Sequence, residues 1–181
     1  MKATGIVRRI DDLGRVVVPK EIRRTLHIRE GDPLEIFTDR EGEIILKKYS
    51  PIGELGAFAK QYAEALAVST GHIISITDRD LHIAVAGAAK KELMEKPISK
   101  QLEDMINKRG SRLAVSGDEG FIPILADDTE SFMVQVICPI ITEGDAIGSV
   151  IITAKEKVKM GEVEEKLALA AANFLGRQME Q

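Results

Sequence analysis

A short basic segment, residues 1–50, opens the chain and ends at the dipeptide Ser50-Pro51. A domain of about 50 residues buries too small a fraction of its surface to be comfortably stable alone. The 181-residue chain holds one cysteine, Cys138, so no disulfide can form within it, and the spacing of its three histidines does not suit a metal site. Association remains as the source of stability, and we therefore expect the segment to fold with a second copy of itself.

The charge of the chain is distributed unevenly. The formal net charge is -4, but residues 1–29 hold eight Lys/Arg against three Asp/Glu, whereas residues 51–181 hold 14 against 20. A basic head on an acidic body is typical of a small binding module joined to a second domain. Aromatic residues make up only 4%, which argues against base stacking on single-stranded nucleic acid as the main mode of binding.

The first 50 residues predict two strands, a short helix and a hairpin. Residues 5–10 and 15–18 are β-prone and flank a turn signal at 11–14. Pro19 suits the first position of a helix, which we place at 20–27. Strands at 34–38 and 43–48 flank a hairpin loop at 39–42. The apolar alternation of the first strand is imperfect, as expected where both faces of a strand meet protein or ligand.

The rest of the chain predicts an α+β domain with an antiparallel sheet. Long helices are expected at 52–69 and 162–179, and shorter ones at 88–95 and 99–109, the latter capped by Ser99. Between them we expect a hairpin at 72–77 and 81–86, short apolar runs at 113–115 and 121–125, and long strands at 133–141 and 146–154. We accordingly divide the chain into residues 1–50, a linking helix at 51–70 and a domain at 71–181.

Both long helices carry apolar stripes with heptad-like spacing. The members are Ile52, Leu55, Ala59, Tyr62 and Leu66 in the first helix and Val163, Leu167, Ala170 and Phe174 in the second. Two interpretations stay open: each stripe covers the sheet of its own chain, or the helices form an intersubunit bundle that builds a tetramer. Both hold if different faces are used.

Three stretches resemble the AbrB family of bacterial transition-state regulators: residues 4–28 (TGIVRRIDDLGRVVVPKEIRRTLHI), Gly31-Asp32 and residues 43–49 (EIILKKY). The resemblance implies a swapped-hairpin barrel, an intertwined homodimer that binds double-stranded DNA. The remainder resembles a GAF domain, a small-molecule sensor fold. The combination is similar to a sporulation regulator that activates and represses forespore genes, which implies a transcription regulator in the bacterial cytoplasm, associated with the nucleoid.

Family members place arginines on the DNA-facing surface. Carried over by motif position, the primary candidates here are Arg8, Arg15, Arg23 and Arg24. Secondary candidates are Lys2, Arg9 and Lys20. Guanidinium groups make bidentate contacts to phosphates and to guanine edges. Residues 1–50 contain no Asn or Gln, the side chains that read adenine, so we expect many phosphate contacts and a preference set partly by DNA shape.

Three residues of the basic segment have expected roles in its turn. Asp11 and Asp12 would repel phosphate, and we interpret them as turn formers. Gly14 is expected to supply a positive backbone angle.

The sequence contains no set of residues that is typical of a catalytic site. The sequence contains no H-E-x-x-H, Walker or G-x-S-x-G motif, and Cys138 lies in an apolar run that predicts a buried, inert thiol. We therefore expect no catalytic residues, no metal and no resident cofactor. Two alternatives were weighed: an enzyme whose N-terminal module only oligomerises, and an antitoxin. The apolar, structured tail argues against the antitoxin, because such proteins usually end in a disordered toxin-binding segment.

The GAF-like part predicts a site for a small molecule of unknown identity between its sheet and its helices. Such a ligand alters DNA affinity only if it binds two arrangements of the chain unequally. The helix at 52–69 joins the two modules directly, so we expect it to transmit such a change of arrangement. No apolar run reaches the 18 or so residues that a membrane span requires, so we expect no membrane partner.

Overall fold

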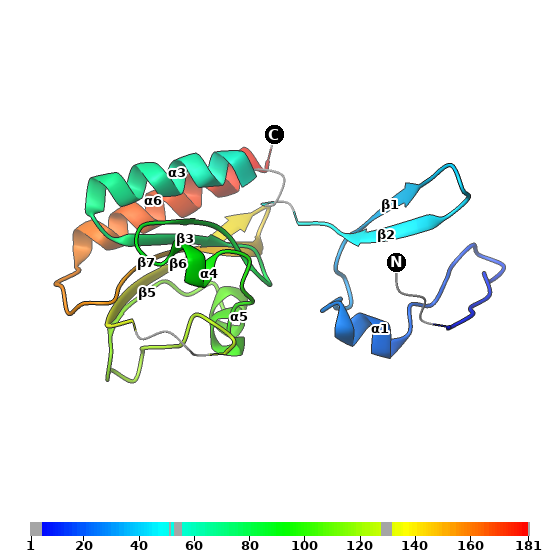
Figure 1. The fold of residues 1–181 in the computed structure, drawn as a ribbon, viewed down its shortest axis with the longest axis horizontal. Coiled ribbons are helices and arrows are strands. Elements are labelled where there is room, and N and C mark those ends of the chain that lie inside the picture. The colour runs from blue at the N-terminus through cyan, green and yellow to red at the C-terminus, as the bar shows by residue number, and fades with distance from the viewer. Residues whose placement is uncertain (1–4, 51, 53–55, 128–131, 181) are drawn as a thin grey trace. The chain divides into compact units, whose positions relative to one another are not determined.

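A computed structural model describes residues 5–50, 52, 56–127 and 132–180. The chain divides into two compact units, Met1–Tyr49 and Ser50–Gln181. Figure 1 shows the two units, each with its own sheet. None of the helices in the described part of the chain is long and apolar enough to cross a membrane.

The first unit contains one helix and one hairpin. Helix α1 spans Lys20–Thr25. Strands β1 (Leu34–Thr38) and β2 (Ile44–Lys48) pair antiparallel, with Leu34 opposite Lys48. The loop between them is an Asx turn, because the Asp39 carboxylate accepts hydrogen bonds from the amides of Glu41 (3.0 Å) and Glu43 (2.9 Å). The predicted hairpin is thus confirmed.

The two strands predicted at 5–10 and 15–18 are not found in this structure. Residues 5–18, all of which it describes, have no strand, although they form a turn in which the Asp11 amide donates to the Arg15 carbonyl (3.0 Å). Their apolar side chains are exposed: Val7 by 86%, Ile10 by 65% and Val17 by 71%. A strand is defined by a ladder of hydrogen bonds to a neighbour, and a single chain provides none here.

The second unit is built on a five-stranded antiparallel sheet in the order β4-β3-β7-β6-β5. Its strands are β3 (Ile73–Thr77), β4 (His82–Ala86), β5 (Arg112–Val115), β6 (Val134–Thr142) and β7 (Asp145–Ala154). Central β7 is buried over eight consecutive residues, from Ile147 to Ala154, because both faces of the sheet are covered. The apolar run at 121–125 forms no strand: that segment is irregular, with a single bridge between Leu125 and Ile98.

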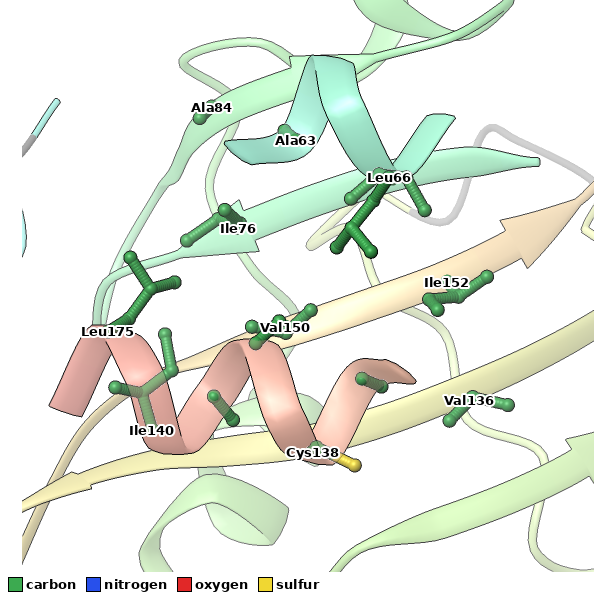
Figure 2. Close-up of a cluster of buried hydrophobic side chains, with 14 of the residues drawn as sticks. Ala63, Leu66, Ile76, Ala84, Val136, Cys138, Ile140, Val150, Ile152 and Leu175 are labelled. Atoms are coloured by element: carbon green, nitrogen blue, oxygen red, sulfur yellow. The ribbon is translucent and has the colours of Figure 1, made fainter. Parts of the chain in front are cut away.

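Helices cover both faces of this sheet (Figure 1). On one face lie α3 (Gly56–Thr70) and α6 (Glu162–Gln178), which pack over a core that includes Ile76, Val150 and Ile152 (Figure 2). On the other lie α4 (Lys90–Leu93) and α5 (Lys100–Asn107), which cover Ile137 and Ile151. The Ser99 hydroxyl caps α5 by accepting from the Leu102 amide at 3.0 Å, as predicted.

The two predicted apolar stripes differ in how far their residues are buried. On α3, Ala59 and Leu66 are buried against the sheet of their own chain, as is Ile52, whereas Leu55 lies outside the described residues. On α6 the predicted stripe is displaced, since Val163 is 66% exposed and Ala170 is also exposed. The buried side of α6 is formed instead by small residues and one leucine, namely Ala168, Ala171, Ala172, Leu175 and Gly176.

Candidate nucleic-acid interface

Helix α1 is short but closed at both ends. Pro19 precedes it as the N-cap rather than as its first residue, is buried, and accepts from the Arg23 amide at 3.0 Å. At the C-terminal end His27 adopts a left-handed conformation (φ 52°). The Ile28 amide donates to the Arg23 carbonyl (2.8 Å) and the His27 amide to that of Arg24 (3.4 Å), which is the Schellman pattern. These caps hold the backbone that carries the basic side chains of the helix.

A tight turn sets the position of Arg15. One carboxylate oxygen of Asp11 accepts hydrogen bonds from the amides of Leu13 (3.0 Å) and Arg15 (2.7 Å). Gly14 has a φ of +76° and accordingly has the conformation that the sequence predicted. The negative charge of Asp11 is therefore used inside the turn, which confirms its role as a turn former.

The predicted DNA-contacting residues come from two segments of the first unit. Arg8, Arg9 and Arg15 lie in the extended segment before α1 and are exposed, as are Lys20 and Arg24 on α1. Arg23 is half-buried, and its Nε has no hydrogen-bond partner in the described part of the structure. Lys2 lies outside the described residues.

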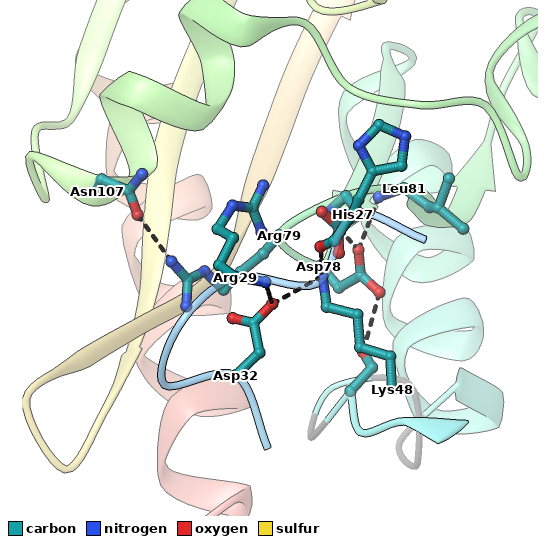
Figure 3. Close-up of polar contacts among 10 residues, drawn as sticks. His27, Arg29, Asp32, Lys48, Asp78, Arg79, Leu81 and Asn107 are labelled. Carbon is teal, nitrogen blue, oxygen red and sulfur yellow. Dashed lines mark hydrogen bonds and ion pairs between the residues drawn. The ribbon is translucent and has the colours of Figure 1, made fainter. Parts of the chain in front are cut away.

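A polar cluster next to α1 engages the side chain of Lys48. The Lys48 ammonium donates to the His27 carbonyl (2.8 Å) and forms an ion pair with Asp32 (3.3 Å), which also accepts from the Arg29 amide at 2.8 Å (Figure 3). Burial by itself would raise the pKa of Asp32, but the Arg29 amide and the Lys48 charge outweigh it and lower that pKa. This pair could not be predicted from local patterns, because its members are 16 positions apart and meet only through the hairpin.

The hairpin tip has the opposite charge. Asp39, Glu41 and Glu43 are exposed, and their carboxylates lie within 4.8 Å of one another. A cluster of carboxylates repels phosphate. The tip of the β1–β2 hairpin is therefore unsuited to a DNA surface, and the basic residues of 8–24 are the suited ones.

The interior of the second unit holds a buried histidine on β4. His82 is fully buried, with Nδ1 2.7 Å from the Ser75 hydroxyl and Nε2 3.1 Å from the Ile124 carbonyl. Burial lowers the pKa of His82 to about 4, although its bond to Ile124 acts in the opposite direction. Because Ser75 is also fully buried, this serine–histidine contact has no access for a substrate.

Cys138 is buried as predicted. Burial raises the pKa of the Cys138 thiol, although a hydrogen bond from Ser111 opposes the shift. The thiol is therefore protonated at neutral pH and is a weak nucleophile.

The space between the sheet and helices α4 and α5 is occupied by the protein. Leu93, Leu102 and Ile106 from the helices meet Ile137 and Ile151 from the sheet in a continuous core. A ligand of this unit therefore requires another cavity or a rearranged core.

Comparisons with known proteins agree with the two units. The family described as "Stage V sporulation protein T C-terminal, transcription factor" matches residues 54–180. The family described as "Antidote-toxin recognition MazE, bacterial antitoxin" matches residues 7–54. Among solved structures, the GAF domain of a phosphoenolpyruvate-protein phosphotransferase from Acinetobacter covers 69% of this chain and 81% of its own, with a TM-score of 0.58 and 13% identity. The predicted GAF-like fold is confirmed.

Two proteins of Bacillus subtilis are similar to this chain in amino-acid sequence. The transition state regulatory protein AbrB of Bacillus subtilis is 67% identical over 51 residues, which are 28% of this chain and 52% of that protein. Stage V sporulation protein T of Bacillus subtilis is 58% identical over 181 residues, the full length of both chains. The resemblance of residues 1–50 to AbrB is thereby confirmed, and the chain belongs to the stage V sporulation protein T family.

Proposed function

We propose that the protein is a transcription regulator of sporulation genes that binds double-stranded DNA through the arginines of a dimeric N-terminal unit. The observation that carries this function is the set of exposed cations at 8–24 in a unit 67% identical to AbrB. The assignment gives the chain a binding function rather than a catalytic one. Its place of action is the cytoplasm, on the DNA of the forespore.

The exposed apolar surface of the first unit supports a dimer. Val7, Ile10, Leu13 and Val17 lie in the extended segment, and each is at least 65% exposed. At roughly 25 cal/mol per Å² of apolar surface, covering them from both chains gives several kcal/mol. A second copy whose extended segments pair with these would supply both the missing ladder and the missing core.

The charge pattern supports binding to duplex phosphates. In a two-fold dimer every basic side chain occurs twice, so Arg8, Arg15, Arg23 and Arg24 give eight guanidinium groups. Each neutralised phosphate contributes about -0.9 to the slope of log K against log salt concentration. Steep salt dependence is therefore expected, with the acidic hairpin tip facing away from the duplex.

A tetramer is the proposed assembly of the full chain. Phe174 of α6 stacks on Phe58 (ring centroids 5.7 Å apart) and on Tyr62 (5.3 Å) of α3, and Phe58 remains 41% exposed. With Val163 and Leu169 also exposed on α6, an apolar surface remains on the outer side of the two helices. A second pair of such helices would cover it and join two dimers.

The proposed DNA contacts are tested by replacing Arg24 with alanine, with Arg40→Ala as the matched control. Both side chains are exposed, but Arg40 lies at the acidic hairpin tip. If both copies of Arg24 contact phosphate, fluorescence anisotropy across a salt series gives a slope shallower by about 1.8. Arg40→Ala leaves the slope unchanged. Equal slopes for Arg24→Ala and the wild type would remove Arg24 from the interface, and no duplex binding by the wild type would refute the proposed function.

An antitoxin is the second candidate, because residues 7–54 match an antitoxin family. It predicts that the second unit captures a toxin, whereas the regulator needs no such partner. Duplex binding by the full chain compared with residues 1–53 locates the DNA site. Tight capture of a purified bacterial toxin, with inhibition of the activity of that toxin, would favour the antitoxin.

A further inference from the structure

A small cavity lies at the edge of the second unit, between the end of α5 and the start of β5. Its volume is about 280 Å³, just below the range of about 300–1,000 Å³ that is usual for ligand pockets. Its lining includes Gln101, Asp104, Met105, Lys108, Arg112 and Ile122. Strand β5 is the last in the sheet order, so the cavity opens where the filled interior of the GAF-like fold ends.

The electrostatics of the cavity favour an anion. The Lys108 ammonium has no hydrogen-bond or ion-pair partner among the described residues, and Arg112 has one long hydrogen bond, to the Gly120 carbonyl at 3.4 Å. The acidic lining residue Asp104 is already paired with Lys100 at 3.3 Å. The C-terminal end of α5 contributes only about half a negative charge. The lining therefore contains two cations and one carboxylate, which is already paired.

The remaining lining is apolar and suits the body of an organic molecule. Met105 and Ile122 are half-buried and pack against the core between the sheet and α5. An inorganic ion would leave these two side chains in water, whereas a small organic anion would cover them. The Arg112 guanidinium can bind a carboxylate or a phosphate in a bidentate manner.

Polar contacts connect the helix that lines this cavity to the start of the second unit. The Arg79 guanidinium donates to the Asn107 side chain at the end of α5 (3.3 Å), and neighbouring Asp78 accepts from the Ser50 hydroxyl (3.0 Å), as Figure 3 shows for Arg79 and Asn107. Both contacts involve the short β3–β4 turn, which Asp78 closes by accepting from the Asp80 and Leu81 amides (2.7 Å each). Ser50 directly follows Tyr49, the last residue of the first unit.

We propose that the cavity between α5 and β5 binds a small organic anion, and that the β3–β4 turn transmits its occupancy from α5 to Ser50. The second part rests on the proposed function, because its readout is DNA affinity. The first part stands independently of DNA binding.

Binding is tested on the full chain by isothermal titration calorimetry with three probes of similar shape: 4-methylpentanoate, 3-methylbutyl phosphate and the neutral 4-methylpentanamide. The expected result is binding of at least one anion, with the amide at least tenfold weaker. The preferred anion identifies a carboxylate or a phosphate ligand. Arg112→Gln weakens that anion by at least about tenfold, as loss of a charged hydrogen bond predicts, whereas the exposed control Lys91→Gln does not. No binding of either anion, or equal binding by Arg112→Gln, would overturn the site.

Transmission is tested with Asn107→Ala, which removes the contact to Arg79 but no residue of the cavity lining. The expected result is that a saturating anion changes the DNA affinity of the wild type severalfold, while Asn107→Ala binds the anion equally well and shows no such change. Hydrogen exchange of residues 78–82 changes on binding only in the wild type. An anion that binds without altering DNA affinity or exchange would refute the transmission while leaving DNA binding itself intact.

Discussion

Lowering the pH is expected to destabilise the second unit through His82. The Ile124 carbonyl can only accept, so Nε2 carries the proton and Nδ1 accepts from the Ser75 hydroxyl. Protonation would place a charge at a fully buried position, and burial accordingly lowers the pKa of His82 to about 4 from 6.5. Because the folded pKa is the lower one, the unfolded chain binds the proton first as the pH falls. Stability is complete above pH 6.5 and is lost between there and pH 4.

The size of the loss follows from the shift in pKa. At about 1.4 kcal/mol per pH unit, the difference amounts to roughly 3 kcal/mol below pH 4 and about 2 kcal/mol already at pH 5. Urea denaturation followed by circular dichroism at pH 7.5 and pH 5 measures it. The wild type is compared with His82→Gln, which cannot titrate, so that contributions of other groups cancel in the difference between the two pH dependences.

The reasoning is refuted if wild type and His82→Gln lose the same free energy of unfolding between pH 7.5 and pH 5. An NMR titration of the His82 ring is an independent check. It should show a neutral imidazole down to about pH 4, and a midpoint near 6.5 would contradict the burial described here.

Three further substitutions probe the packing and the caps. Gly176→Ala should lower the free energy of unfolding by about 1–3 kcal/mol, because the added methyl group would overlap the Ile141 carbonyl. Gly56→Ala is the control, since a methyl group there meets open space. Equal melting temperatures for Gly176→Ala and the wild type would contradict the close approach. His27→Gly should stabilise α1 by up to about 1 kcal/mol, since His27 has a left-handed backbone. The expected observation is slower hydrogen exchange of the Ile28 amide, and faster exchange would contradict the prediction. Asp32→Asn should cost about 1–2 kcal/mol by weakening the contacts to Lys48 and the Arg29 amide, which denaturation of the full chain would detect as a shift that Glu30→Gln does not produce.

Local patterns in the sequence predicted the elements whose cause is local. The β1–β2 hairpin follows from Asp39 and the glycine of its loop, the turn at Asp11–Arg15 from Asp11 and Gly14, and the start of α5 from the Ser99 hydroxyl. Each of these features depends on hydrogen bonds between residues at most four positions apart. The candidate DNA-contacting residues also occupy one continuous motif, but their role in binding stays a prediction.

Errors arose where an element depends on distant partners. The segments at 5–10 and 15–18 have the composition of strands, but one chain offers them no ladder of hydrogen bonds. The stripe predicted on α6 was displaced because close approach to β6 selects small residues such as Gly176 rather than the largest apolar ones.

The sequence by itself determined the basic head and its turns, the cap of α5, and the alternation of helices and strands in the second unit, since these properties depend on neighbouring residues. Only the tertiary structure decided that Lys48 is held by Asp32, that His82 is buried against Ile124, and that Lys108 and Arg112 flank one cavity. These pairs are 4 to 42 positions apart along the chain, and their members meet through folding of the backbone between them. Burial and the resulting change in electrostatic energy are properties of that arrangement, and no local pattern of residues encodes them.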